Sequence, residues 1–148
     1  MIRRHLAAAA LTAAAVTAPA LPAAADEAKT LVTLITAAEP QSQLMGMVLT
    51  MAAMQQGATA HVLLCGPAGD IALREAPETA TAPQPPRGAS PQGLMQAIMA
   101  EGATVEVCAI YLPGRGEGPE VLIDGVSVAQ PPAMAARLLA EDARILSF

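Results

Sequence analysis

Two cysteines are the residues of this sequence with the clearest potential for chemistry, and each stands in a short apolar run. Cys65 ends the run AHVLLC, and Cys108 lies in TVEVCAIYL, just before the segment LPGRGEGPE that carries Arg115. The thiolate is the nucleophilic form of cysteine, and a nearby guanidinium favours it over the thiol. We therefore take Cys108 as a candidate nucleophile and Arg115 as a candidate thiolate-stabilising residue. The alternative is that each cysteine is inert packing in an apolar strand.

The elements that would position these cysteines follow from the spacing of apolar residues. Short apolar runs predict strands at residues 31–36, 60–65, 104–112, 125–129 and 143–148, and helical spacing predicts helices at 40–56, 91–101 and 131–142. Strands that alternate with helices in this way require crossover connections and a parallel sheet covered on both faces. The predicted fold class is α/β, with a three-layer α/β/α sandwich.

Two irregular segments interrupt this alternation. Residues 76–90 (APETATAPQPPRGAS) are rich in Pro, Ala and Thr, which predicts a flexible loop within the domain. Residues 112–120 are rich in Gly and Pro and follow the third strand directly. Open α/β sheets bind ligands at the carboxyl ends of their strands, so we expect both segments to overhang the rim that carries Cys108.

The start of the chain has the three zones of a secretory signal. Arg3 and Arg4 precede an apolar run at residues 6–18, and the sequence PALPAAA follows. The apolar run is too short to span a bilayer. We expect a cleavable signal peptide at residues 1–25, with cleavage after Ala25, a single domain at 26–148, a periplasmic location and no membrane span.

The charge and aromatic content of the predicted domain narrow its partners. Without the two arginines of the signal, six basic and thirteen acidic residues remain, a net charge of −7. An acidic surface disfavours nucleic acid. The chain also has one Tyr, one Phe and no Trp, so stacking of aromatic side chains on bases is not available.

Other polar and sulfur-containing residues suggest no second site. His61 opens the second predicted strand, and we expect a partly exposed structural residue. Four methionines lie along the first predicted helix: Met45, Met47, Met51 and Met54. Positions 47, 51 and 54 share the face that should cover the sheet, so we interpret the methionines as core packing rather than as a copper site. Carboxylates after Cys108 are expected to solvate the loop: Glu117, Glu120 and Asp124. No phosphate-binding glycine motif follows the first strand, and we predict neither a metal nor a cofactor.

Over residues 31–148 the sequence resembles the DsrE/DsrF-like (YchN-like) family of small sulfur-handling proteins. The segments that carry the resemblance are LVTLIT, AMQQGATAHVLLCG, LMQAIMAEGATVEVC and LIDGVSVAQPPAMAARLLAEDARILSF. The resemblance implies a five-stranded parallel sheet of order 4-3-2-1-5 and assembly into homo-oligomers, as trimers or hexamers. It also implies that Cys108 carries sulfur as a persulfide, taken from a sulfur donor and passed to a thiol of an acceptor protein.

The sequence departs from the family pattern in two respects. Some members carry a second cysteine three residues after the first, and here that position is Tyr111. The family's sulfur relays act in the cytoplasm, whereas this chain carries an export signal. Sulfur transfer through Cys108, as a sulfurtransferase or sulfur carrier, is therefore weighed against a non-catalytic oligomeric binding or assembly module.

Cys65 bears on that choice. The strand order that the resemblance implies places strands two and three side by side, so that Cys65 and Cys108 end neighbouring strands. Neighbouring strands lie within the distance that a disulfide tolerates, and an oxidising compartment favours the bond. Such a bond is either a structural crosslink or a redox switch in which Cys65 is the resolving thiol.

Overall fold

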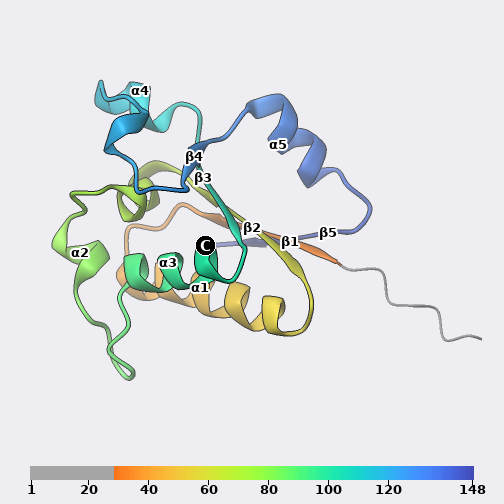
Figure 1. Ribbon diagram of the computed structural model, residues 1–148, viewed down its shortest axis with the longest axis horizontal. Helices are drawn as coiled ribbons and strands as arrows, with labels where there is room; N and C mark the ends of the chain where they lie inside the picture. Colours follow the sequence, from red (N-terminus) through yellow and green to blue (C-terminus); the bar gives the residue numbers. More distant parts are fainter. Residues whose placement is uncertain (1–28) are drawn as a thin grey trace, which may run out of the picture.

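The computed structural model describes residues 29–148 (Figure 1), so the predicted signal peptide and its cleavage after Ala25 lie outside the described residues. The strands are β1 (Thr30–Ile35), β2 (Thr59–Leu64), β3 (Thr104–Val107), β4 (Ser127–Val128) and β5 (Ala143–Ser147). The helices are α1 (Pro40–Gln55), α2 (Glu78–Thr81), α3 (Pro91–Ala100), α4 (Tyr111–Arg115) and α5 (Pro131–Leu138), with 3-10 helices η1 (Gly66–Ala72) and η2 (Pro119–Val121).

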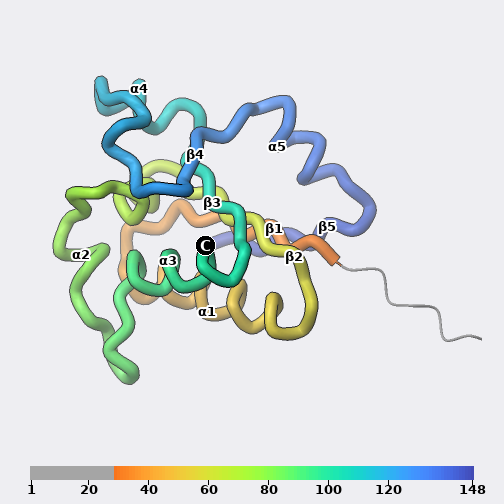
Figure 2. The backbone as a smooth tube through the Cα atoms, in the orientation of Figure 1, coloured from red at the N-terminus to blue at the C-terminus, as the bar shows by residue number. Residues whose placement is uncertain are grey.

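The five strands form one sheet of order β4-β3-β2-β1-β5, and all neighbouring pairs are parallel. Figure 2 shows the chain crossing from β4 over α5 to β5 at the opposite edge. The α/β class, the three-layer architecture and the expected strand order are confirmed. Because every strand runs in the same direction, all carboxyl ends lie along a single rim.

The two faces of the sheet are covered unequally. Figure 1 shows α1 and α3 side by side on one face and α5 on the other. The α1 face buries the larger core, which includes Ile35, Met47, Leu64, Met95, Ile98 and Val107. The α5 face buries a smaller cluster of Val32, Leu63, Ala129 and Met134, with Cys65 and Cys108 packed against it. Cys65 therefore packs on the thinly covered face, whereas Cys108 packs against both clusters.

The third strand is shorter than the sequence pattern predicted. Residues 104–112 read as one strand, but β3 ends at Val107, and the chain turns into α4. The turn is closed by a hydrogen bond from the Tyr111 amide to the Cys108 carbonyl, at 2.9 Å. Ile110 is 81% exposed, whereas the next two residues, Tyr111 and Leu112, are both buried, which departs from the alternation of a strand with one exposed face. The Gly/Pro-rich segment that follows contains α4 and η2 rather than irregular loop alone.

Two other predicted elements differ in extent. The helix predicted at residues 131–142 ends at Leu138, and the strand predicted at 125–129 is reduced to Ser127–Val128. The segment 76–90 contains α2 and an antiparallel bridge between Gln84 and Ala89. This local structure was not visible in the composition, and the flexibility of the segment stays a prediction.

His61 is buried, with 3% of its surface exposed, so the expectation of a partly exposed residue was wrong. The side chain of His61 lies on the α5 face, where its Nε2 is 2.7 Å from Oε2 of Glu106 on the neighbouring strand. Arg137 of α5 approaches both groups, at 3.2 Å from His61 Nε2 and 3.6 Å from Glu106 Oε2. A proton on Nε2 is required for the short contact with the carboxylate. This cluster anchors α5 to the sheet.

The burial of His61 predicts a pH dependence of stability. Burial first, and then Arg137, lower the pKa of His61 below 6.5, against the opposing effect of Glu106. Below pH 6.5 the unfolded chain therefore binds a proton that the folded chain does not, and stability falls as the pH falls. We expect the free energy of unfolding, measured by urea titration, to be lower at pH 5.5 than at pH 7.5. Below pH 6.5 the decrease that His61 causes should not exceed about 1.4 kcal/mol per pH unit, the value for one proton.

The matched control is His61→Gln, which keeps a buried polar side chain but does not titrate. Its free energy of unfolding should be lower overall and nearly flat across the same interval. An equally steep pH dependence in this variant would assign the effect to other groups.

Candidate functional site

The pair Cys65 and Cys108 lies at the carboxyl rim of the sheet, where the two residues form a disulfide. Leu64 and Val107 are the last paired residues of β2 and β3, so each cysteine is the next residue along its strand. The amide of Cys108 donates to the Leu64 carbonyl at 2.8 Å, which extends the ladder by one step. The Cα atoms of the two cysteines are 5.0 Å apart. The sheet itself thus brings the two sulfur atoms together.

The disulfide is partly accessible. Both cysteines are half-buried, and neither lies within the fully enclosed core. Their apolar neighbours on the α5 face include Leu63 and Met134.

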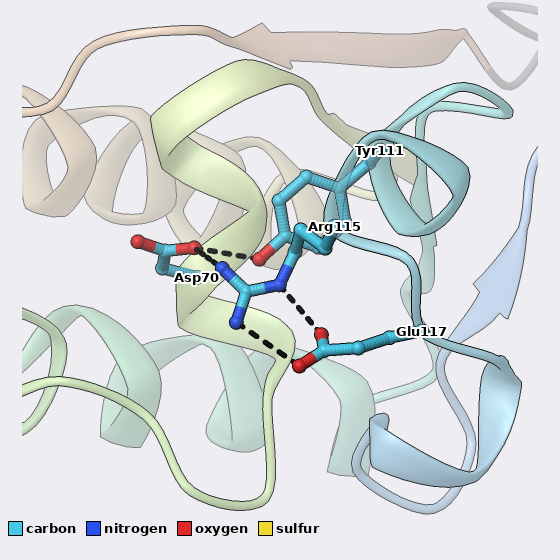
Figure 3. Close-up of polar contacts among 4 residues, drawn as sticks. All are labelled: Asp70, Tyr111, Arg115 and Glu117. Atoms are coloured by element: carbon cyan, nitrogen blue, oxygen red, sulfur yellow. Dashed lines mark hydrogen bonds and ion pairs between the residues drawn. The ribbon is translucent and has the colours of Figure 1, made fainter.

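Arg115 is placed near this rim but is engaged by carboxylates. Its Nε donates to Glu117 Oε2 at 2.6 Å, and its Nη1 donates to Asp70 Oδ1 at 3.3 Å, as Figure 3 shows. The hydrogen bond to Glu117 is the main reason that the pKa of Arg115 is raised. Among the described residues, the hydrogen bonds and ion pairs recorded for Arg115 run to these carboxylates and not to Cys108. These contacts give no support to the predicted role of Arg115 in stabilising a Cys108 thiolate, which stays a prediction.

Tyr111 belongs to the same group of residues, in which the guanidinium of Arg115 lies between Asp70 and Glu117 (Figure 3). Its hydroxyl donates to Asp70 Oδ1 at 2.6 Å, and the guanidinium of Arg115 lies 5.6 Å from the centre of its ring. The ring packs so closely on Gly69 that a Cβ atom there would overlap it. Burial first, and then the hydrogen bond to Asp70, raise the pKa of Tyr111, so its hydroxyl stays protonated and acts as a donor.

These contacts join the two segments that follow the cysteines. Gly69 and Asp70 belong to η1, which begins directly after Cys65, and Tyr111 and Arg115 form the ends of α4, which begins three residues after Cys108. We call Gly69, Asp70, Tyr111 and Arg115 the rim lock. Sequence reasoning singled out Tyr111 only as a missing cysteine and did not identify Asp70, its partner 41 residues away.

A cavity of about 350 Å³ opens beside the rim lock, between the end of η1, the end of α4 and η2. Its lining combines two arginines with three glutamates: Arg74, Arg115, Glu75, Glu117 and Glu120, together with Leu73 and Val121. Arg74 is held by the Glu120 carbonyl and by Asp124. Two of the carboxylates that were expected to solvate this loop, those of Glu117 and Asp124, therefore also bind its arginines.

The methionines of α1 are distributed over several environments. Met47 is fully buried in the core, as interpreted from the sequence, whereas Met45 is 49% exposed. Met51 and Met54 pack against the core and also line a second cavity of about 550 Å³ at the amino ends of the strands. Within residues 29–148 there is no cluster of three or more His, Cys, Asp or Glu residues that could hold a metal ion. No helix in this part of the chain is long and apolar enough to cross a membrane.

Comparison with known proteins gives a structural relationship. No family model matches the sequence, and no curated protein matches it. The solved structure of the YchN protein from E. coli is similar, with a TM-score of 0.65 and 23% sequence identity over 81% of this chain and 99% of YchN. A protein of unknown function from Methanobacterium thermoautotrophicum, MTH1491, is similar with a TM-score of 0.62 and 14% identity over 81% of this chain and 99% of MTH1491. The described part of the chain therefore has the YchN-like, DsrE-like fold, with its cysteine pair at the carboxyl rim of that fold.

Proposed function

We propose that the protein handles sulfur outside the cytoplasm, with Cys108 accepting sulfane sulfur as a persulfide and passing it to a thiol of a partner protein. The observation that carries this proposal is the position of Cys108, at the carboxyl end of a central strand, half-buried and paired with a second thiol. The YchN-like fold supports it, since the resemblance in sequence to sulfur-handling proteins extends over the same residues. The reaction needs a nucleophilic thiol and no metal or cofactor.

The disulfide defines the state that must react first. In the oxidised protein neither sulfur is a nucleophile, so a reducing thiol, from a small molecule or a partner protein, has to open the bond. The Cys108 thiolate then attacks the terminal sulfur of a donor such as thiosulfate, which leaves Cys108–S–SH and sulfite. An oxidising compartment, which the export signal predicts, returns the pair to the disulfide between cycles.

A second candidate function is a non-catalytic assembly module that keeps the fold and uses the disulfide as a structural crosslink. The closed Cys65–Cys108 bond and the tyrosine at position 111 favour this candidate. The two functions differ in what the reduced protein does with a sulfur donor.

Persulfide formation is tested by mass spectrometry of the reduced protein after incubation with thiosulfate or polysulfide. A Cys65→Ser variant, which cannot form the disulfide, should gain 32 Da at Cys108, about the mass of one sulfur atom, and the adduct should be lost on reduction. The control is Cys65→Ser with Cys108→Ser, which should gain nothing. No adduct on the reduced single variant would leave only the assembly function.

The resting state of the pair is tested by thiol titration of the unreduced protein in denaturant. We expect no reactive thiol before reduction and two per chain after it, because the pair is closed at 5.0 Å between Cα atoms. Two free thiols in protein purified from the periplasm would place the resting protein in the reduced state.

We also propose that the protein is a homo-oligomer that uses α1 as a contact. Three large apolar residues at helical spacing lie 41–49% exposed on its outer surface: Met45, Val48 and Leu49. Apolar groups gathered on one surface favour burial against a second copy.

Light scattering should show a trimer or hexamer for the wild type. The double variant Val48→Glu with Leu49→Glu should form a smaller species. Leu139→Glu, at the exposed residue directly after α5, is the control that should leave the mass unchanged. An unchanged mass for the α1 variant would exclude α1 as the contact.

A further inference from the structure

We propose that the reduced protein goes beyond carrying sulfur: Cys65 attacks the persulfide on Cys108 and releases the accepted sulfur as hydrogen sulfide, with Asp70 and Tyr111 as positioning residues. The protein would then be a sulfane-sulfur reductase that ends each turnover as the Cys65–Cys108 disulfide. This inference rests on the proposed persulfide at Cys108, and it decides the fate of that persulfide.

The first step of the argument is the fixed separation of the two cysteines. The amide of Cys108 bonds to the Leu64 carbonyl and the amide of Cys65 bonds to the Ile35 carbonyl, at 2.8 and 2.9 Å. These bonds belong to the sheet and do not depend on the disulfide. With Cα atoms 5.0 Å apart, the Cys65 thiol stays within reach of Cys108 after reduction.

The second step is the rim lock, which joins the segments that follow the two cysteines, η1 after Cys65 and α4 after Cys108. The hydroxyl of Tyr111 donates to Asp70 at 2.6 Å, and Arg115 bonds the same carboxylate. The Tyr111 ring fills the space over Gly69. Figure 3 shows the polar contacts that join η1 to α4. Because these contacts exist in addition to the disulfide, we infer that opening the disulfide leaves the two segments aligned.

The third step is the chemistry that this alignment favours. A persulfide on Cys108 has an inner sulfur, Sγ, and an outer sulfur. Attack of the Cys65 thiolate on Sγ forms the Cys65–Cys108 bond, breaks the bond between the two sulfur atoms of the persulfide, and expels the outer sulfur as HS⁻. The two thiols are oxidised to a disulfide, and the sulfane sulfur is reduced to sulfide, so that two electrons are transferred without a further co-reactant.

Competition between the two fates of the persulfide follows from concentration. An acceptor protein must arrive by diffusion, whereas Cys65 is held next to Cys108 and acts as an intramolecular nucleophile with a high effective concentration. Release of sulfide therefore outpaces transfer whenever Cys65 is reduced. Transfer to a partner predominates only when the partner is already docked at the rim.

The test is a single turnover of the reduced protein, freed of reductant, with thiosulfate and then with polysulfide. Wild-type protein should release about one sulfide per chain in excess of the Cys65→Ser variant, and should end as the disulfide by mass and thiol titration. Cys65→Ser should retain the added sulfur on Cys108 and release no excess sulfide.

The outcomes separate this inference from the proposed function. If Cys65→Ser gains no sulfur at Cys108, the proposed function fails and the inference fails with it. If Cys65→Ser gains sulfur, and wild-type protein also retains the persulfide without releasing sulfide, the inference alone is overturned.

The positioning role is tested with Tyr111→Phe, which removes the hydroxyl but keeps the ring against Gly69. The rate of sulfide release should fall roughly three- to tenfold, the range that corresponds to loss of one hydrogen bond. Persulfide formation at Cys108, measured with Tyr111→Phe in the Cys65→Ser background, should keep its rate. If Tyr111→Phe slows persulfide formation and sulfide release equally, or slows neither step, the positioning role of Tyr111 is contradicted.

The matched control for the lock is Arg74→Gln. Arg74 lies on the same rim and is also bound to a carboxylate, Asp124, but it makes no contact within the rim lock in the described structure. The rates of sulfide release and of persulfide formation in this variant should both match those of the wild type. An Arg74→Gln variant that slows sulfide release as much as Tyr111→Phe would show that general loosening of the rim, and not the lock, controls the step.

Discussion

The pairing of β2 with β3 is the constraint on which the remaining features depend. These two strands run parallel and in register, so the residues that follow them, Cys65 and Cys108, are neighbours at the rim of the sheet. The same pairing sets the starting points of η1 and α4 and thereby brings Asp70 to Tyr111. A shift of the register by one residue would turn one cysteine to the opposite face of the sheet and separate the pair. The disulfide and the rim lock are consequences of one ladder of hydrogen bonds.

The amino-acid sequence predicted the elements of the fold more accurately than their ends. Apolar runs and helical spacing located the strands and the main helices, because burial on both faces leaves a strong pattern. The end of β3 was misjudged, since CAIYL is as apolar as a strand. Only the folded structure shows that Tyr111, the first residue of α4, is buried against Gly69, while Ile110 is exposed to solvent.

The sequence and the family resemblance together predicted that the two cysteines are neighbours, but they did not predict the polar contacts around them. The adjacency of Cys65 and Cys108 required a strand order, which the family resemblance supplied and which helix and strand spacing alone does not contain. The contacts of Asp70 with Tyr111 and of His61 with Glu106 join residues 41 and 45 positions apart, and nothing local marks such partners. The guanidinium of Arg115 binds the carboxylates of Glu117 and Asp70, and the spacing of residues along the chain did not point to these partners in place of the Cys108 thiol.

The disulfide also closes a long loop of the chain. Cys65 and Cys108 are separated by 43 positions, and the loop between them contains η1, the Pro-rich segment with α2, and α3. Closing a loop of this length removes conformational entropy from the unfolded chain, worth about 4 kcal/mol in the chain-entropy model. Each reduction of the pair would therefore bring the protein closer to its unfolding threshold, and each reoxidation would move it away. If the protein reacts through its reduced thiols, as proposed, the reacting form is also the form with the smaller free energy of unfolding, and it would be open to proteolysis more often than the oxidised form.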